Sequence, residues 1–284
     1  GLLLTGGSDI YCAPSIYVWT CILAPSTLFF FHVFPSLWHR GAYALPVAVL
    51  ATFVVSTGLL LLTCCTDPGI IPRREVIIAT RCAAELEALL GYDVLGTKGG
   101  STGLEPKMPE TLRKQGYRWC HTCRIIRPPR ASHCPDCDNC VMRYDHHCPF
   151  VNNCVGQRNY HFFFGFITSV LVLAMLVIPS ILTYFSAINA EVTMNQMTSV
   201  SSSMRMYFYG LAIGCLLIII AALLSFVLWA YHVFLITTKK TTKEFRRSIA
   251  NISEEPTLCA ARGPPLFDPR ALVDPEDLGR EAGE

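Results

Sequence analysis

Four blocks of the chain are almost uniformly apolar, carry no Asp, Glu, Lys or Arg, and alternate with polar segments. They run from about Ile16 to Phe34, Ala42 to Cys65, His161 to Phe185 and Met206 to Ile236. A helix needs about 20 apolar residues to cross the hydrocarbon core of a bilayer. The pattern therefore predicts four transmembrane helices. Buried helices of a soluble protein are the alternative, but a charged fraction of only 15% argues against it.

The first block is the weakest of the four, because Pro25 and Ser26 interrupt it and His32 lies near its end. Pro46 and Pro179 fall inside the second and third blocks. Proline is tolerated in a membrane helix where neighbouring groups satisfy the freed carbonyl. We therefore keep all four blocks as predicted membrane helices.

Basic residues predict the orientation. Residues 66–159 hold 13 of the 23 Lys and Arg residues, and residues 237–284 hold 8, whereas the two shorter loops carry only Arg40 and Arg205. Because basic residues mark the cytoplasmic side, both basic segments and the N-terminus are predicted to be cytosolic. The first stretch has no charged n-region, so no signal peptide is predicted.

The predicted fold class is an all-α integral membrane protein with a small cysteine-rich cytosolic module between helices two and three. Its parts are an N-terminal segment (1–15), helices one and two (16–65), a linker (66–116), the module (117–159), helices three and four (160–236) and a tail (237–284). In the linker, apolar residues at helical spacing from Glu75 to Leu95 predict an amphipathic helix. Gly and Pro from Lys98 to Pro109 predict a flexible connector.

The module holds Cys and His residues at regular spacing. A Cys-x2-Cys turn can aim two thiolates at one ion. Disulfides are the alternative, but thiols stay reduced in the cytosol. Two tetrahedral zinc sites would use six cysteines and two histidines: Cys120, Cys123, His133, Cys134, Cys137, Cys140, His147 and Cys154.

This count leaves Cys148 and His146 over, with Asp145 beside them. A thiol, an imidazole and a carboxylate suit a nucleophile, its base and a group that orients the base. Spacing alone leaves open whether the free thiol is Cys148, Cys140 or Cys154. Only residues 155–160 separate the module from the third apolar block, so Cys148 is predicted to lie near the membrane boundary.

Residues 118–164 resemble the cysteine-rich domain of the DHHC family of protein S-acyltransferases (palmitoyltransferases). Seven motifs carry the resemblance: Cys120-His121-Thr122-Cys123, Arg127-Pro128-Pro129-Arg130, Ser132-His133-Cys134, Cys137-Asp138-Asn139-Cys140, Asp145-His146-His147-Cys148-Pro149, Asn152-Asn153-Cys154-Val155-Gly156 and Asn159. The family usually has Trp where this chain has Phe150. Phe keeps the apolar ring but lacks the indole donor.

The resemblance implies two structural Zn²⁺ ions that together staple one strand-poor module. The implied ligand sets are Cys120, Cys123, His133 and Cys140 for one ion, and Cys134, Cys137, His147 and Cys154 for the other. It also implies catalysis by Asp145, His146 and Cys148. The Cys148 thiolate would attack a fatty acyl-CoA, and a cysteine of a protein substrate would then remove the acyl group.

Two further motifs match the family: Asp67-Pro68-Gly69 after the second block, and Thr241-Thr242-Lys243-Glu244 after the fourth. Alone they would be an ordinary turn and a helix end. The resemblance implies that Thr241, Thr242 and Glu244 brace the catalytic module, and adjacent threonines can bond nearby backbone groups.

Contacts to acyl-CoA are also expected. Guanidinium groups suit phosphate, and four arginines are candidates: Arg127, Arg130, Arg246 and Arg247. Anionic lipid headgroups are their alternative partner. Phe150, Phe163 and Phe166 follow Cys148 on the way into the membrane and are candidates to line an acyl cavity, with ordinary helix packing as the alternative.

The expected partners are membrane lipid, fatty acyl-CoA and cysteine-containing protein substrates, in the Golgi or endoplasmic reticulum. The Arg-Pro-Pro-Arg run and Leu258-Cys259 resemble a branch in which some members use a small accessory subunit. Cys259, Cys64 and Cys65 are candidates for acylation themselves, although packing is the simpler interpretation. A membrane-anchored RING-like zinc adaptor is the rival hypothesis. Nucleic acid is not an expected partner, given four spans and a net charge of +2.

Overall fold

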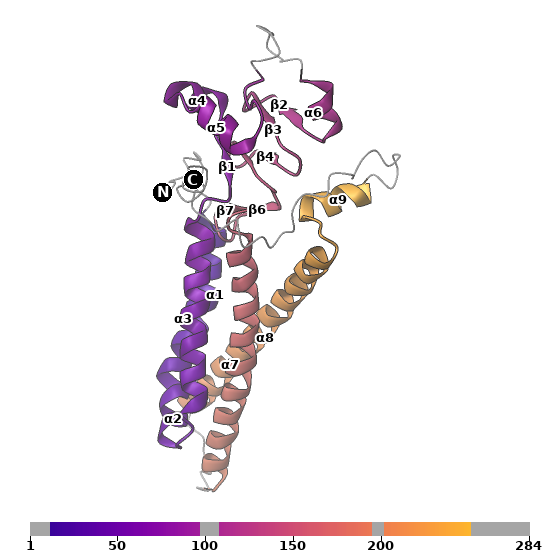
Figure 1. Ribbon diagram of the computed structural model, residues 1–284. Coiled ribbons are helices and arrows are strands. Elements are labelled where there is room, and N and C mark those ends of the chain that lie inside the picture. Colours follow the sequence, from indigo (N-terminus) through magenta and orange to yellow (C-terminus); the bar gives the residue numbers. More distant parts are fainter. Residues whose placement is uncertain (1–11, 97–107, 195–201, 251–284) are drawn as a thin grey trace, which may run out of the picture. The chain divides into compact units, whose positions relative to one another are not determined.

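The computed structural model describes residues 12–96, 108–194 and 202–250 (Figure 1). Most of the predicted N-terminal segment and connector, part of the 186–205 loop, and residues 251–284 of the tail lie outside the described residues, as does Cys259. The described residues form two compact units. The helical unit contains residues 12–62 and 162–233, and the cysteine-rich unit contains residues 63–161 and 234–250 within the described ranges.

Apolar helices of different lengths make up the helical unit. They are α1 (Cys12–Leu28), the π-helical turn η1 (Phe29–Val33), α2 (Phe34–His39), α3 (Ala44–Cys65), α7 (Tyr160–Met194) and α8 (Ser202–Thr237). Among the described residues, three stretches are long and apolar enough to cross a membrane: Ala44–Cys65, Tyr160–Ile188 and Ala212–Thr237. The chain is therefore mostly helical, with three candidate membrane spans.

The first apolar block differs from the prediction because the π-helical turn at Phe29–Val33 divides it into shorter regular helices. Aromatic rings hold this turn. Phe30 packs edge-on against Phe53 of α3, with ring centroids 5.6 Å apart, and Phe29 is fully buried. The block is helical, but no single α-helix in it reaches the length of the other three.

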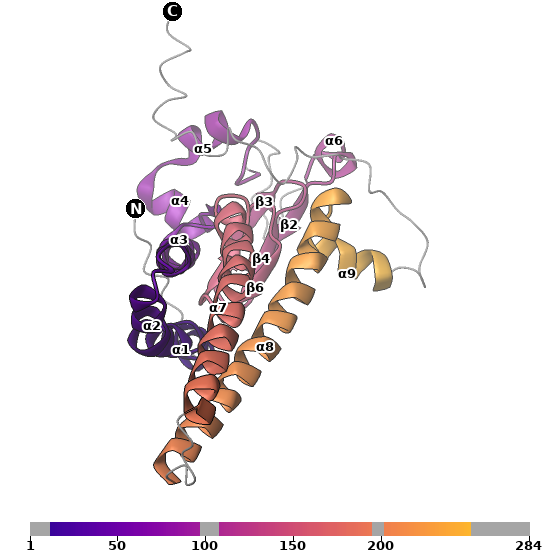
Figure 2. The ribbon, with the colours of Figure 1, turned by 90° about the horizontal axis from the view of Figure 1, so that it is seen from below.

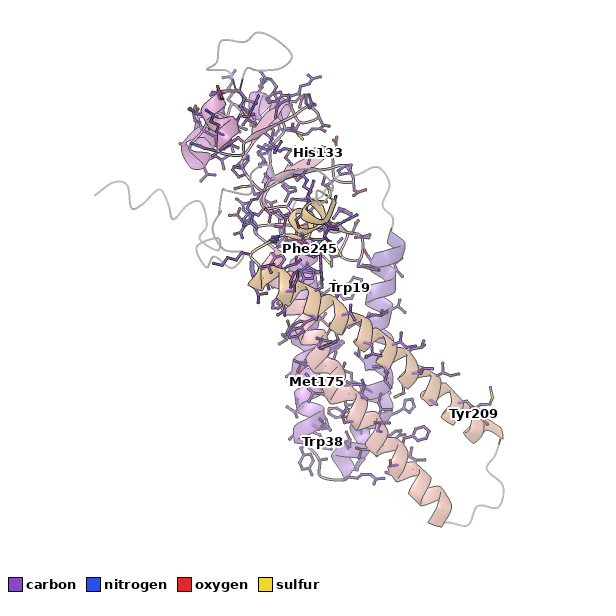
Figure 3. The ribbon with its side chains drawn as sticks, turned by 90° about the vertical axis from the view of Figure 1, so that its right-hand side faces the viewer. Trp19, Trp38, His133, Met175, Tyr209 and Phe245 are labelled. Carbon is purple, nitrogen blue, oxygen red and sulfur yellow. The ribbon has the colours of Figure 1, made fainter. Side chains whose placement is uncertain are left out.

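Large apolar side chains point outward from these helices. Met175 on α7 and Tyr209 on α8 are 66% and 64% exposed (Figure 3). Between α7 and α8, the indole N–H of Trp229 donates to the hydroxyl of Thr168 over 3.1 Å. Figure 2 shows these two helices side by side. An apolar exterior with polar contacts kept inside is typical of helices surrounded by lipid.

Short antiparallel strands build the cysteine-rich unit. They are β1 (Ile70–Ile71), β2 (Arg118–Cys120), β3 (Ile125–Arg127), β4 (Ser132–Cys134), β5 (Asn139–Val141), β6 (His146–Cys148) and β7 (Asn153–Val155). They pair as a sheet β1-β5-β4 and two hairpins, β2-β3 and β6-β7. The expectation of a strand-poor module was wrong. Strands of two or three residues carry too little alternation for a sequence pattern to reveal them.

The predicted helix from Glu75 to Leu95 was also wrong in extent. The structure has two short helices there, α4 (Arg74–Thr80) and α5 (Ala83–Leu90), because Arg81 adopts a left-handed conformation with φ 57° and ends α4. The other helices of this unit are α6 (Glu110–Lys114) and α9 (Thr242–Ala250). A small core of apolar side chains and buried cysteines joins the linker to the strands, including Ile77, Tyr92, Ile125 and Cys123.

Candidate active site and metal centres

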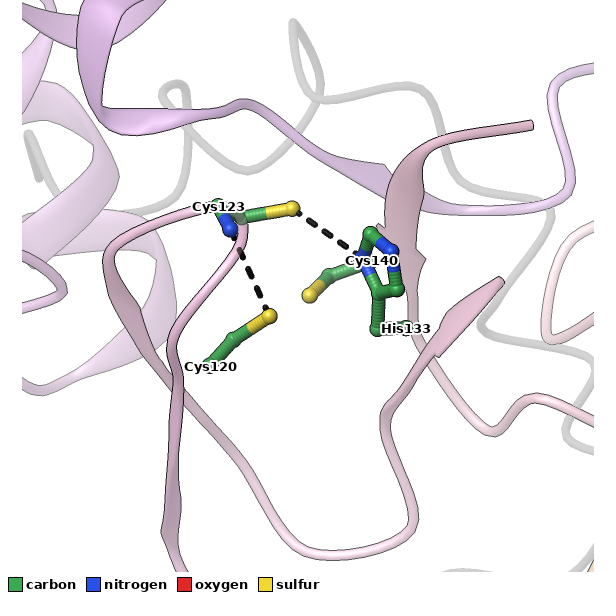
Figure 4. Close-up of side chains that lie close together, drawn as sticks. All are labelled: Cys120, Cys123, His133 and Cys140. Atoms are coloured by element: carbon green, nitrogen blue, oxygen red, sulfur yellow. Dashed lines mark hydrogen bonds between the residues drawn. The ribbon is translucent and has the colours of Figure 1, made fainter. Parts of the chain in front are cut away.

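The first candidate metal centre is formed by residues of β2, β4, β5 and the turn after β2. His133 and Cys140 face each other in the β4-β5 register, and Cys120 and Cys123 come from the β2-β3 turn. Their ligand atoms all lie within 4.8 Å of one another (Figure 4). The His133 Nδ1 is 3.3 Å from the Cys123 Sγ. Residues far apart in the chain are thus brought to one point.

The second centre joins the β6-β7 hairpin to the turn after β4. His147 and Cys154 are directly opposite in the hairpin, and Cys134 and Cys137 complete the group. The His147 Nδ1 lies 3.3 Å from the Cys137 Sγ and 3.7 Å from the Cys154 Sγ. The eight predicted ligands therefore fall into the same two sets of four that the family resemblance implied.

These separations fit a tetrahedral metal ion. Zinc bonds of about 2.3 Å to sulfur and about 2.0 Å to nitrogen give ligand–ligand edges of roughly 3.5–3.8 Å. The contacts of 3.3–3.7 Å lie within about 0.2 Å of those edges. In the first centre, the other ring nitrogen of His133 faces the Asp138 carboxylate at 3.7 Å, as expected of an outer-shell partner that fixes a ligand tautomer. Both groups can hold a metal ion.

Cys148 belongs to neither group and lies at the end of β6, 7% exposed. The neighbouring His146 Nδ1 is 2.7 Å from the Asp145 Oδ2. Asp145 itself is almost completely buried, with 1% exposure. A buried ionised carboxylate is costly unless its oxygens are hydrogen-bonded. The other hydrogen bonds to the Asp145 carboxylate therefore determine whether it can stay ionised and orient His146.

Helix α9 supplies those partners. The Thr242 N–H donates to Asp145 Oδ1 over 2.8 Å, and the Thr242 hydroxyl donates to Oδ2 over 2.7 Å. Thr242 is the first residue of α9, so the carboxylate lies at the positive end of that helix. Thr241 and Glu244 form a reciprocal capping box, in which each side chain accepts the other's backbone N–H.

Glu244 also anchors α9 to the cysteine-rich strands. Its carboxylate takes the Arg130 Nε at 2.7 Å and Nη2 at 2.9 Å, a two-pronged contact with a guanidinium that is only 10% exposed. Arg130 additionally donates to the Lys239 carbonyl. The Thr-Thr-x-Glu motif thus braces Asp145 from one side through Thr242 and holds its own helix in place through Glu244.

The electrostatics favour a charged pair at Cys148 and His146. Burial alone would raise the pKa of Cys148, but the His146 hydrogen bond and the backbone N–H groups of Val151 and Phe150 lower it below its usual value. Burial would lower the pKa of His146, yet Asp145 and Cys148 raise it to about 9. The pKa of Asp145 stays below its usual value because the hydrogen bonds from His146 and Thr242 outweigh its burial.

The Asp67-Pro68-Gly69 turn clamps the loop that follows β7. Asp67 Oδ1 accepts the N–H groups of Gly69 and Ile70, and Oδ2 pairs with Arg158 at 2.7 Å. Gly69 has φ +103°, which favours glycine. A Cβ on Gly156 would lie 2.5 Å from the Pro68 carbonyl oxygen. The two segments can approach this closely only because residue 156 has no side chain.

Two buried asparagines fasten the same region to the end of α3. Asn159 accepts the Gly156 N–H and donates to the carbonyls of Cys154 and Thr63. Asn153 donates to three main-chain carbonyls there, those of Thr63, Cys64 and Thr66. Sequence reasoning singled out Asn159 but missed this role of Asn153. Only its place in the Asn152-Asn153-Cys154 motif could have indicated it.

The remaining predicted residues fall in different places. Phe150 follows Cys148 in the cysteine-rich unit and is 48% exposed. Phe163 and Phe166 are buried in the helical unit, where Phe163 packs against His232 with ring centroids 5.1 Å apart. Arg130 forms an ion pair with Glu244.

Arg127 and Arg247 lie near a cation that sequence reasoning missed, Lys243. Lys243 donates to the Ser132 hydroxyl and lies over the Tyr144 ring, 4.9 Å from its centroid. Burial lowers the pKa of Lys243, and the charges of Arg247 and Arg127 lower it further. The charges of these three cations act on one another, and together they can attract a phosphate-bearing ligand.

Comparison with known proteins matches the same part of the chain. A family model described as DHHC palmitoyltransferase matches residues 113–249. Palmitoyltransferase ZDHHC18 of Rattus norvegicus is 34% identical over 192 residues, which are 66% of this chain and 46% of that protein. Palmitoyltransferase ZDHHC14 of Homo sapiens is 32% identical over 281 residues, covering 90% of this chain and 54% of that protein.

Palmitoyltransferase ZDHHC9 of Bos taurus is 32% identical over 279 residues, which cover 91% of this chain and 73% of that protein. The chain belongs to the DHHC palmitoyltransferase family. It spans about half the length of ZDHHC18 and ZDHHC14. The DHHC family match includes both candidate metal groups, Cys148 and the bracing motif of α9, whereas the Asp67-Pro68-Gly69 turn precedes the matched segment.

Proposed function

We propose that this protein transfers a long-chain fatty acyl group, such as palmitoyl, from acyl-CoA to cysteine thiols of proteins. One observation carries the proposal. Cys148 is a thiol outside both metal groups, its pKa is lowered beside His146, and α9 holds the Asp145 carboxylate that orients this imidazole. Membership of the DHHC palmitoyltransferase family supports it.

The reaction runs in two steps through Cys148. His146 accepts the thiol proton, and Asp145 holds the imidazole in the required tautomer and stabilises its positive charge. The thiolate attacks the thioester carbon, the bond from that carbon to the CoA sulfur breaks, and an acyl-enzyme forms on Cys148. A cysteine of the protein substrate then attacks, with His146 taking its proton, and carries the acyl group away.

Exchange of one thioester for another is nearly isoenergetic, so activation and positioning are what the protein must supply. The two groups of four ligands suit structural Zn²⁺, because each set fills a tetrahedron and leaves no open position. In this proposal the ions fold the strands that carry His146 and Cys148 and take no part in bond making. The metal-binding free energy then becomes folding free energy.

We also propose that Cys148 works at the water–lipid border. Asn153, its directly opposite partner in the β6-β7 hairpin, is bonded to the last carbonyls of the candidate span α3. An acyl chain buried in the bilayer would then present its thioester to the thiol. The full arrangement proposed has four membrane helices, with the first formed by residues 16–34, and a cytosolic cysteine-rich unit. The proposed location is the Golgi or endoplasmic reticulum.

For the nucleotide part of acyl-CoA, we propose three contacts: Arg127, Arg247 and Lys243. These cations lie close together, whereas Arg130 already has the Glu244 carboxylate as its partner. Phe150, Phe163 and Phe166 remain the proposed acyl contacts. A small accessory subunit is a further proposed partner, on the strength of the Arg-Pro-Pro-Arg run at residues 127–130.

The test is incubation of the purified full chain with radiolabelled palmitoyl-CoA. We expect thioester-linked label on the wild type and its loss in Cys148→Ser. As a matched control, Cys82→Ser changes a half-buried thiol of the same unit that belongs to neither metal group, and should keep the label. A folded, zinc-loaded wild type that takes up no label would refute the enzyme and favour the zinc adaptor.

A further inference from the structure

Two adjacent thiols end the candidate span α3. Cys64 is half-buried and Cys65 is exposed, and neither belongs to a metal group. Both lie in the cysteine-rich unit together with the β6-β7 hairpin, because that unit begins at Thr63. The mechanism above uses neither thiol. Their surroundings show which of the two can take part in acyl chemistry.

Asn153 brings Cys64 close to Cys148. Its side-chain amide donates to the Cys64 carbonyl over 3.1 Å, and also to the carbonyls of Thr63 and Thr66. In the β6-β7 hairpin, Asn153 is directly opposite Cys148. Side chains at directly opposite positions share one face of an antiparallel pair, with Cβ atoms about 4.5–5.5 Å apart. The Cys148 thiol thus projects from the same face of the hairpin as the amide that grips Cys64.

One further observation agrees with this placement. A cavity of ≈ 20 Å³ is lined by Cys64, Cys65 and Asn153, among others, so the side chains at the helix end have room to change rotamer. Cys64 is therefore a neighbour of the proposed nucleophile, and no metal competes for its sulfur.

We propose that Cys64 is a second acylation site, filled by transfer of the acyl group from Cys148 within the same chain. This inference rests on the proposed function of Cys148. The Cys64 sulfur attacks the thioester carbon on Cys148, a new carbon–sulfur bond forms, and the bond to the Cys148 sulfur breaks. The Cys64 proton passes through the His146 imidazole to the departing sulfur. No oxidant or reductant is needed, because one thioester replaces another.

The transfer has a measurable consequence. A chain that carries its acyl group on Cys64 has a free Cys148 and can be charged again from acyl-CoA. The acyl chain on Cys64 extends from the end of a candidate membrane span, so it can enter the bilayer beside α3. Purified protein incubated with excess acyl-CoA should therefore hold two acyl groups per chain, on two identified cysteines.

The experiment incubates the full chain with excess palmitoyl-CoA and maps acylated peptides by mass spectrometry. We expect acyl groups on both Cys148 and Cys64 in the wild type, and on Cys148 alone in Cys64→Ser. Cys65→Ser is the matched control: it changes the adjacent, exposed thiol and should keep both groups. In Cys148→Ser, neither Cys148 nor Cys64 can be filled, so the peptide holding Cys64 should stay unmodified.

Each other outcome overturns the inference in a distinguishable way. Acyl groups on Cys148 alone in the wild type reject the second site and leave the proposed function standing. Acylated Cys64 in Cys148→Ser shows direct reaction with acyl-CoA, and the same result only after mixing with wild type shows transfer between chains. No acyl group anywhere rejects the proposed function as well. An unmodified Cys64 in the wild type rejects the second site even if a variant fails to fold.

Discussion

The hydroxyl of Thr242 offers the sharpest test of how the site is organised. Thr242→Val removes that hydroxyl, keeps a β-branched side chain at the start of α9, and leaves the backbone N–H in place to donate to Asp145 Oδ1. The lost bond spans 2.7 Å to Oδ2, the same oxygen that contacts the His146 Nδ1. The variant therefore removes one of the hydrogen bonds that hold the Asp145 carboxylate against the proposed base, and leaves Cys148 unchanged.

The expected cost follows from the burial of Asp145, which is 1% exposed. A hydrogen bond to a charged group contributes about 1.5–3 kcal/mol, and water cannot easily replace it at a buried carboxylate. If that loss falls on the orientation of His146, acyl-enzyme formation slows by roughly 10- to 100-fold, because about 1.4 kcal/mol corresponds to tenfold in rate. The thermal unfolding midpoint should fall as well.

The assay is single-turnover labelling of the purified protein with radiolabelled palmitoyl-CoA, together with thermal unfolding in the same detergent. Thr242→Ser restores a hydroxyl and should recover most of the rate. Thr237→Val serves as a control, since the Thr237 hydroxyl is exposed and bonds only within its own helix turn, to the Phe234 carbonyl. If the valine variant forms the acyl-enzyme as fast as the serine variant, the bracing role assigned to α9 is wrong.

Three further outcomes are expected. Cys134→Ala, or treatment with a strong chelator, should lower the folded yield and the bound zinc, whereas Ala at the proposed nucleophile should change neither; equal yields would contradict a ligand role. Gly156→Ala should lower stability by about 1–3 kcal/mol in thermal unfolding, because its Cβ would lie 2.6 Å from a valine methyl group, while Gly58→Ala, with nothing within 4 Å, should not. Glu244→Gln should cost about 1–3 kcal/mol by leaving a nearly buried guanidinium without its charged partner, and Glu110→Gln, in an exposed ion pair, serves as its control.

The sequence by itself predicted the candidate metal-binding segment and the helical character of the chain. Thiols and imidazoles at fixed short spacings indicate metal binding, although spacing alone left open which of three thiols stays free. Their division into two sets came from the family resemblance, and the structure groups the same residues. The three long candidate spans could also be predicted from the sequence, because apolar runs of that length are typical of membrane-spanning helices.

Only the tertiary structure decided what surrounds Asp145. Thr242 bonds to Asp145, and Arg130 bonds to Glu244 of the bracing helix, across separations of about a hundred residues in the chain. No local sequence pattern encodes such contacts. The same holds for the reach of Asn153 to the end of α3. Local periodicity failed where elements are too short to carry a period, as in the strands, and where one backbone angle at Arg81 ends a helix. Spacing along the chain indicates that a segment can bind metal, but long-range packing decides which residues share one ion, which thiol has a base, and which neighbour that thiol can reach.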